Sequence, residues 1–309
     1  MNMGAGWLRQ IQVETVKDPG HRSRCSRNAV TLIELLVVLS ILSLLVGILL
    51  PTVRAVRHKA QSLLGMSRQS HIVGAVSLFA TDNDERYPQS IAKVGFNQMW
   101  NWSDPTKLAG SDLRTPGLCR SVSASLRTYL PAAETLSCPS APQQYKYLQQ
   151  AWDAGDAWDN PETPVAPDVV GGTYCLYWNY VGWLGPEGRV FQGPQGPAGG
   201  RPCSTLLVSD YLGHNPWRTP GAFAACEPFQ GGEAAPETTL LSSYWYSTAD
   251  ANVAPRIVLR AGYSDGHVEA YGSEEVAPLR VIKLRSEMIP YGDDEPGPGV
   301  FYLPRDAVP

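Results

Sequence analysis

The chain has 309 residues, a formal net charge of −4 and a pI near 5.8. Charged residues make up 17% of it, and no basic face is evident beyond the N-terminal region, which argues against a nucleic-acid-binding protein. The 29 glycines and 26 prolines indicate a loop-rich chain rather than a dense helical bundle. The length leaves room for one sizeable domain or two small ones.

The N-terminal region consists of a basic leader followed by an apolar segment. Residues 1–29 contain Lys17, Arg22, Arg24 and Arg27 and show no apolar periodicity. The segment from Val30 to Leu50 is about 31 Å long as an α-helix, enough to cross the hydrocarbon core of a bilayer. It contains one carboxylate, Glu34, near its start. An acid in such a helix is costly, so it usually has a partner and a function.

Two simpler interpretations compete for this segment. A cleaved secretory signal ends in small residues after its apolar region, whereas here Pro51 and a continuing periodic pattern follow. An uncleaved signal anchor explains the hydrophobicity. It does not explain Glu34 or the Ala29–Val30 junction directly after a basic leader.

The residues Ala29-Val30-Thr31-Leu32-Ile33-Glu34-Leu35-Leu36 resemble the start of the prepilin family, which comprises type IV pilins and the pseudopilins of type II secretion. Ala29 stands where the family usually has Gly, and Val30 where it usually has Phe. Glu34 becomes the fifth residue of the mature chain and Pro51 the twenty-second, as in the family. The resemblance implies cleavage after Ala29 and N-methylation of the Val30 amine by a prepilin peptidase/methyltransferase.

The resemblance also implies a location and partners. The leader is expected in the cytoplasm, a single pass in the inner membrane among its lipids, and the head in the periplasm or on the cell surface. The expected protein partners are other pilin-like subunits and a secretion or pilus assembly machinery. The free amine of Val30 is mostly cationic at neutral pH, so it can neutralise Glu34 of a neighbouring chain and set the axial register.

The apolar pattern continues beyond Pro51 at three- and four-residue steps as far as Phe79. Because a proline bends a helix when the pattern resumes after it, we expect one helix from Val30 to Ala80, about 75 Å long. The predicted organisation is therefore a cleaved leader at 1–29, a transmembrane and amphipathic helix at 30–80, a β-rich globular head at 81–289, and a poorly ordered Pro/Gly/acidic tail at 290–309.

The segment Thr81 to Pro88 ends the predicted helix. Its carboxylates suggest a calcium loop, but the spacing lacks the glycine and distal glutamate of an EF-hand, and turn chemistry is favoured. The "DND…YP" phrase resembles large pseudopilin-like proteins of environmental bacteria, planctomycetes among them. Further shared landmarks are Tyr129-Leu130 before Cys138-Pro139-Ser140, Leu206 to Asp210, and Ser264-Asp265-Gly266-His267-Val268.

The head is predicted to be α+β and pilin-like, with the long helix packed on an antiparallel sheet and long loop insertions. The sequence from Ile91 to Val170 is expected to be irregular apart from a short helix between Leu118 and Leu130. Strands are expected at Thr173–Trp183, Ser204–Tyr211 and Leu240–Tyr246. Arg256–Ser264 and His267–Tyr271 flank Asp265-Gly266, the strongest hairpin signal in the chain.

Two motifs in the head suggest an enzyme or a ligand site. Gly262-Tyr263-Ser264-Asp265-Gly266 matches the G-x-S-x-G nucleophile elbow, but a strand rather than a helix is expected after it and no histidine follows His267. His267 is expected to bond a turn backbone rather than a ligand, and Asp265, Gly266 and His267 are predicted to form a structural turn. We therefore expect no enzymatic activity, no cofactor and no bound metal.

The aromatic and sulfur-containing residues leave alternatives open. Eight tryptophans of the head are expected in its core: Trp100, Trp102, Trp152, Trp158, Trp178, Trp183, Trp217 and Trp245. Exposed tryptophans could instead stack on sugars. The alternative function is therefore a polysaccharide-binding module anchored by a pilin-type helix. Cys25 leaves with the leader, and the spacing of the remaining five does not assign disulfides: Cys119, Cys138, Cys175, Cys203 and Cys226.

Overall fold

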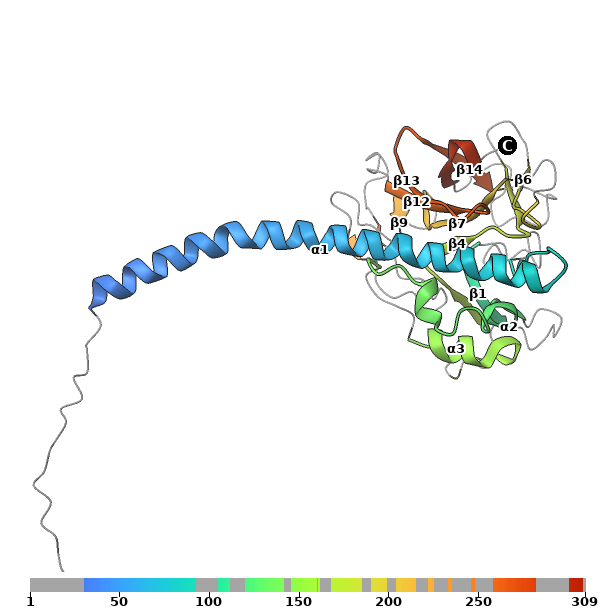
Figure 1. Cartoon of the computed structure of the whole chain (residues 1–309), viewed down its shortest axis with the longest axis horizontal. Coiled ribbons are helices and arrows are strands. Elements are labelled where there is room, and N and C mark those ends of the chain that lie inside the picture. Colours follow the sequence, from blue (N-terminus) through green and yellow to red (C-terminus); the bar gives the residue numbers. More distant parts are fainter. Residues whose placement is uncertain are drawn as a thin grey trace, which may run out of the picture. The chain divides into compact units, whose positions relative to one another are not determined.

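The computed structural model describes residues 31–92, 105–111, 120–141, 146–159, 161, 168–184, 190–198, 204–214, 222–224, 233–234, 246–247, 258–281 and 300–307. The chain forms two compact units, Met1–Val53 and Arg54–Pro309. The fold is α+β, with one long N-terminal helix and antiparallel sheets, which confirms the predicted pilin-like architecture (Figure 1).

Helix α1 runs from Leu32 to Asp82 over 51 residues and contains Pro51, so the single helix predicted across that proline is confirmed. Every residue from 31 to 60 is exposed, whereas a buried face begins at Gly65. The buried residues recur mostly at steps of three and four, which places them on one side of the helix: Gly65, Gln69, Ile72, Val73, Ala75, Val76 and Ala80.

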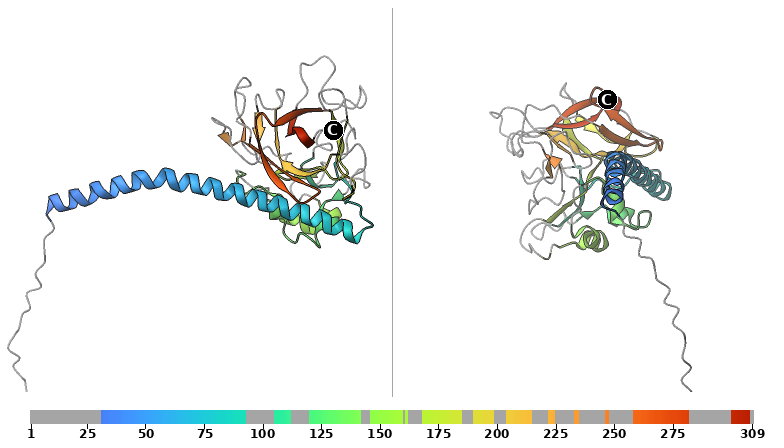
Figure 2. Two further views of the ribbon diagram at one scale, coloured as in Figure 1. Left: turned by 45° about the horizontal axis from the view of Figure 1, so that its top comes forward. Right: turned by 90° about the vertical axis from the view of Figure 1, so that its left-hand side faces the viewer.

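The buried face of α1 packs against a four-stranded antiparallel sheet. Its strand order is β13 (Val268–Gly272), β12 (Val258–Tyr263), β7 (Leu206–Asp210) and β4 (Tyr174–Leu176), and Figure 2 shows α1 passing beside it. Gly262 permits the close approach, because a Cβ there would lie 2.9 Å from a Val73 methyl group and 3.0 Å from one of Val208. The strand expected at Ser204–Tyr211 is confirmed as β7.

A second antiparallel sheet has eight strands. Their order is β10 (Glu233–Ala234), β11 (Tyr246–Ser247), β9 (Ala222–Ala224), β8 (Leu212–His214), β15 (Val300–Pro304), β14 (Val276–Val281), β5 (Val181–Leu184) and β6 (Val190–Gln192). The prediction of a poorly ordered tail is wrong at residues 300–304, because β15 pairs with β14 on one side and β8 on the other. Most of the strand expected at Leu240–Tyr246 lies outside the described residues.

The prediction of a single strand from Thr173 to Trp183 is wrong, because β4 and β5 belong to different sheets. Asn179 separates them with a φ of 51°, and its side-chain amide donates to the carbonyls of Tyr87 and Pro88 at 3.0 and 2.8 Å. Asparagine tolerates this left-handed conformation better than most residues. The run of residues with high strand propensity from Thr173 to Trp183 therefore contains a turn that its composition does not predict.

Residues 105–171 contain more regular structure than predicted. Strands β1 (Lys107–Ser111), β2 (Arg120–Ser121) and β3 (Asp168–Gly171) form a sheet in the order β2-β1-β3. The helical elements are short: α2 (Ser123–Leu126), which lies in the segment where a helix was expected, η3 (Ala133–Leu136), α3 (Leu148–Ala154) and η4 (Gly155–Ala157). These strands are too short to show a clear apolar periodicity, and they pair with segments that are distant in the sequence. A local sequence pattern therefore does not predict them.

The end of α1 is a turn, as its sequence predicts. The backbone N–H of Glu85 donates to Ala80 at 2.9 Å, and Asp84 and Glu85 have φ of 54° and 56°. The following Tyr87 N–H donates to Gln195 at 2.8 Å in the glycine- and proline-rich loop. Gly196 lets that loop lie directly on Glu85, because a Cβ there would be 2.2 Å from the Glu85 carbonyl oxygen.

The core of the head contains the described tryptophans and cysteines. Trp152, Trp158 and Trp178 are buried, which confirms the core interpretation for these three. The side chains of the other five fall in parts of the chain that are not described. Cys138 and Cys175 are buried thiols, and the remaining cysteines lie outside the described ranges.

Candidate functional site

The N-terminus of α1 is closed by a reciprocal capping box. Thr31 precedes the first helical residue, and its hydroxyl oxygen accepts from the Glu34 N–H at 3.3 Å. The Glu34 carboxylate in turn accepts from the Thr31 backbone N–H and the Thr31 hydroxyl, both at 2.8 Å. Thr-x-x-Glu is the sequence pattern of this cap. Glu34 therefore fixes the start of the helix at Leu32, close to the Ala29–Val30 junction, which lies outside the described residues.

The capped segment of α1 is long and apolar enough to cross a membrane by length and composition. Its large side chains are exposed along the whole run, from Leu32 at 80% to Leu50 at 54%. Exposed apolar surface on this scale requires a lipid or protein environment. An N-terminal apolar helix of this kind suggests a single-pass membrane anchor.

Pro51 lies inside α1 and has no N–H to donate to the carbonyl of Gly47, four residues earlier. Nothing among the described residues lies within 4 Å of a Cβ built on Gly47, so this turn of the helix has open space beside it. The hydroxyl of Thr52 donates to the Leu49 carbonyl at 2.8 Å. The helix continues through the proline, as the sequence predicts.

The Asp265-Gly266 turn lies in a hairpin loop of four residues, Ser264 to His267, that joins β12 to β13. The Gly266 N–H donates to the Tyr263 carbonyl at 3.0 Å, and the Tyr263 N–H donates to the His267 carbonyl at 3.0 Å. Gly266 has a φ of +97°, whereas Asp265 is not among the described residues with positive φ. The expected hairpin is confirmed. A two-residue type I′ turn at Asp265-Gly266 would need positive φ at both residues, whereas in this loop only the glycine has it.

Asp265 and His267 pair across this loop. The His267 backbone N–H and its ring Nδ1 both contact Asp265 Oδ1, at 3.1 and 2.5 Å. The hydrogen bond from the His267 backbone lowers the pKa of the Asp265 carboxyl, and the side-chain contact adds to this effect. The His267 ring stacks on Tyr263 at 4.3 Å between centroids. The ring of His267 therefore contacts the Asp265 carboxylate and the Tyr263 ring, rather than the turn backbone that the sequence predicts.

A cluster of hydroxyl and carboxylate groups lies beneath the hairpin. The hydroxyls of Tyr263 and Tyr271 are 2.6 Å apart, and Asp306 accepts from them at 3.2 and 3.4 Å. Burial and the Tyr271 hydroxyl raise the pKa of Tyr263 well above its ordinary value. Asp306 belongs to η5 (Arg305–Ala307), so the cluster attaches the C-terminal segment to the β12–β13 hairpin.

The G-x-S-x-G match does not have the surroundings of a nucleophile elbow. The elbow requires a helix after the serine, and β13 follows here. The nearest histidine, His267, directs Nδ1 to Asp265. Within the described ranges, no group of three or more His, Cys, Asp or Glu side chains is arranged to hold a metal ion.

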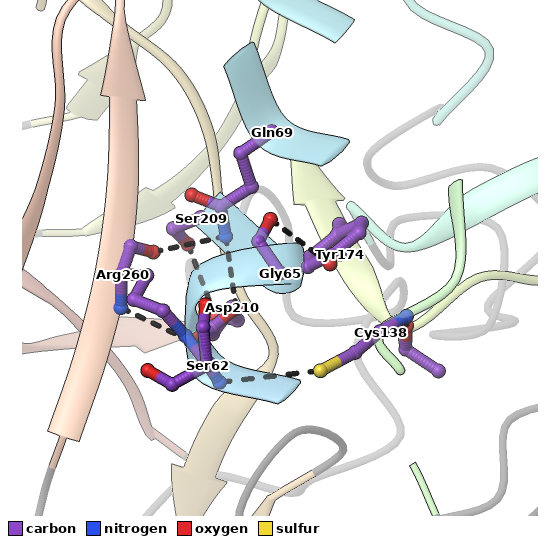
Figure 3. A network of polar contacts seen from close by, with 9 residues as sticks. Ser62, Gly65, Gln69, Cys138, Tyr174, Ser209, Asp210 and Arg260 are labelled. Carbon is purple, nitrogen blue, oxygen red and sulfur yellow. Dashed lines mark hydrogen bonds and ion pairs between the residues drawn. The ribbon is translucent and has the colours of Figure 1, made fainter. Parts of the chain in front are cut away.

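A buried charged network joins α1 to the four-stranded sheet (Figure 3). Arg260 on β12 donates through Nε to Asp210 on β7 at 2.7 Å, and its backbone N–H reaches the same carboxylate at 3.1 Å. The two side chains are 0% and 3% exposed. From α1, Gln69 Nε2 donates to Asp210 at 2.8 Å and to the Arg260 carbonyl at 3.3 Å.

The guanidinium of Arg260 also reaches α1 and Cys138, which follows η3. Its Nη1 donates to the Ser62 carbonyl at 3.4 Å, and its Nη2 lies 3.9 Å from Cys138 Sγ. Gly65 makes room for it, because a Cβ there would lie 3.1 Å from Nη1. The network is structural: it fixes the position of the helix on the sheet.

Sequence reasoning did not identify this network. Asp210 belongs to the Leu206–Asp210 landmark, whereas neither Arg260 nor Gln69 is a predicted site residue. Two signals were available: Gln69 lies on the apolar stripe of the helix, and Arg260 interrupts an otherwise apolar strand. Charged residues at core positions are rarely buried unless they are paired.

Residues 24–50 match the prokaryotic N-terminal methylation motif. Neither the comparison with curated proteins nor that with solved structures gave a match. The matched residues include the end of the basic leader, the Ala29–Val30 junction, Glu34 and the whole apolar segment to Leu50. This match supports the resemblance of the chain to type IV pilin-like proteins, for which the motif implies processing by a prepilin peptidase and assembly with other pilin subunits.

Proposed function

We propose that the protein is a pilin-like structural subunit, cleaved after Ala29 and N-methylated at Val30. It is held in the inner membrane by α1 with its head in the periplasm or on the cell surface, and it assembles into a pilus or a type II secretion pseudopilus. The observation that carries the proposal is the methylation motif at residues 24–50, which coincides with the exposed apolar segment of α1. The one acid of this segment, Glu34, lies in the first turn of the helix.

Glu34 has two roles in this proposal. In the structure its carboxylate caps its own helix through Thr31. In the assembly it neutralises the Val30 amine of a neighbouring subunit, an interaction that requires cleavage because only the mature chain has that amine. Leaving either charge unpaired in an apolar core costs on the order of several kcal/mol, as for other buried ion pairs that lose one partner. This cost favours the axial register in which the two charges meet.

No residue has a catalytic role in the proposed function. The likeness to large planctomycete pseudopilin-like proteins through Ser264–Val268 belongs to the proposal as well. The alternative of a polysaccharide-binding module is not favoured by a described feature, because the three described tryptophans are buried and offer no exposed stacking surface.

Glu34→Gln in the full-length chain tests the proposal. Glutamine supports a capping box as well as glutamate does, so the substitution removes the charge and keeps the helix cap. We expect normal membrane insertion and mature-chain levels, and at least a tenfold loss of cross-linked multimers. The measurement is chemical cross-linking in membranes followed by immunoblotting.

Thr31→Val is the matched control, because it removes the capping hydroxyl and keeps the acid. We expect it to assemble nearly as well as the wild type. Normal multimers in Glu34→Gln, or equal loss in Thr31→Val, would show that charge pairing by Glu34 does not drive assembly.

A further inference from the structure

Three cations follow the apolar segment of α1 within two helical turns. Arg54, Arg57 and Lys59 are exposed, and this group is called the basic collar. No Lys or Arg precedes the collar in α1, and the helix has no acid between Glu34 and Asp82. The collar is therefore a local concentration of positive charge in a chain whose net charge is −4.

The position of the collar along the helix matches the headgroup layer of a bilayer. The apolar segment ends at Leu50, so at about 1.5 Å per residue Arg54 lies about 6 Å beyond it and Lys59 about 13.5 Å. The headgroup region extends about 5–8 Å from each side of the hydrocarbon core. Because Cα–Cβ bonds tilt toward the N-terminus of a helix and long basic side chains extend along apolar surface, all three cations can reach the level of the lipid phosphates.

The collar surrounds the helix instead of lying on one face of it. Successive residues of an α-helix are about 100° apart, which places Arg54 and Arg57 about 60° from each other and Lys59 about 140–160° from both. A membrane surface surrounds a helix that crosses it, so it can contact all three cations. An adjacent helix or a nucleic acid approaches from one side and would leave either the arginines or the lysine uncovered.

We propose that the basic collar binds the phosphate groups of anionic phospholipids, in the leaflet on the C-terminal side of the apolar segment. Guanidinium and ammonium groups donate charge-assisted hydrogen bonds to phosphate oxygens, and clusters of basic residues beside a membrane segment attract anionic lipid. The inference rests on the proposed function, which places α1 across a membrane, and adds to it a lipid class and the residues that bind it.

Photoactivatable lipids test the inference. The full-length protein is inserted into phosphatidylcholine vesicles that contain a small fraction of phosphatidylglycerol or phosphatidylcholine with a photoreactive headgroup. Mass spectrometry of peptides then locates the attached lipid. We expect the phosphatidylglycerol probe to label the peptide that contains the collar about threefold more than the phosphatidylcholine probe does, because only the first has a net negative headgroup.

The triple variant Arg54→Gln, Arg57→Gln and Lys59→Gln assigns this preference to the collar. Glutamine is long and has a helix propensity close to that of Arg and Lys, so the substitutions remove charge and keep the helix. We expect the two probes to label the collar peptide of this variant equally.

The matched control removes the same number of charges from the other side of the apolar segment, with Arg22→Gln, Arg24→Gln and Arg27→Gln in the leader. Its collar peptide should keep the preference of the wild type for the phosphatidylglycerol probe. Loss of the preference in this control, or its persistence in the collar variant, would show that the collar is not the binding site.

The outcomes separate this inference from the proposed function. Equal labelling of the wild-type collar by both probes, in protein that floats with the vesicles, would overturn the lipid site and leave the proposed function intact. A preference that disappears at high protein density in the membrane, or on addition of double-stranded DNA, would assign the collar to a second copy or to a nucleic acid instead. A wild-type protein that does not float with the vesicles would overturn both the lipid site and the proposed function.

Discussion

Gly266 is the residue whose conformation the hairpin depends on most directly. Its φ of +97° suits glycine, and the loop bonds on both sides of it fix that value. Gly266→Val places a β-branched side chain in this conformation at a cost of about 1–3 kcal/mol. We expect a lower melting temperature for the head, measured by circular dichroism.

Ser264→Ala is the control for this prediction, because no side-chain hydrogen bond of Ser264 to another described residue is present. Its melting temperature should equal that of the wild type. An unchanged Gly266→Val, or a hydrolytic activity that Ser264→Ala abolishes, would contradict the structural interpretation of this turn.

Tyr263 makes the stability of the head sensitive to alkaline pH. Its pKa is raised in the folded state by burial and by the Tyr271 hydroxyl, so the folded protein holds the phenol proton more tightly than the unfolded chain does. The resulting stabilisation is fully present below the unfolded pKa of about 10 and is lost as pH rises through the folded pKa.

Urea unfolding between pH 9 and 11.5 measures this effect. The stability of Tyr263→Phe should fall less steeply with pH than that of the wild type, although its stability at pH 8 is lower because two hydrogen bonds are lost. Parallel pH profiles for the two proteins would show that the Tyr263 proton is not linked to folding.

At the scale of elements, the Arg260–Asp210 pair holds α1 on the four-stranded sheet. Asp210→Ala leaves the Arg260 guanidinium buried without its carboxylate and removes an acceptor of Gln69. Breaking one partner of a buried pair costs about 3–5 kcal/mol. We expect a loss of this size in chemical denaturation of the head.

The double variant Asp210→Leu with Arg260→Met distinguishes charge from packing. It replaces both charges with apolar groups, which is often neutral for buried ion pairs. The double variant should therefore be more stable than Asp210→Ala. If it is less stable, the network contributes through packing and hydrogen bonds rather than through charge balance.

At the scale of the whole molecule, features local in sequence could be predicted and features made by distant pairing could not. The helix through Pro51, the turn after Asp82 and the Asp265-Gly266 hairpin follow from periodicity and turn chemistry within a few residues. Strand β15 could not be predicted, because it pairs with β14 and β8, which both lie well before it in the sequence. The same applies to the sheet β2-β1-β3.

The same difference between local and distant features holds for the candidate site. Glu34 and Pro51 were predicted from the resemblance, but the capping box between Thr31 and Glu34 was not, although the Thr-x-x-Glu pattern was visible. The Arg260–Asp210–Gln69 network joins residues 141 and 191 positions apart in the chain. No local pattern specifies such a contact, so only the fold reveals it.

The mature N-terminus tests the central claim most directly. The full-length gene product is expressed in a host with a prepilin peptidase, purified from membranes, and its first residue is determined by mass spectrometry of the terminal peptide. The prepilin-like account predicts Val30 as the first residue, with its amine methylated. A terminus at Met1, or one beyond Pro51, would contradict it.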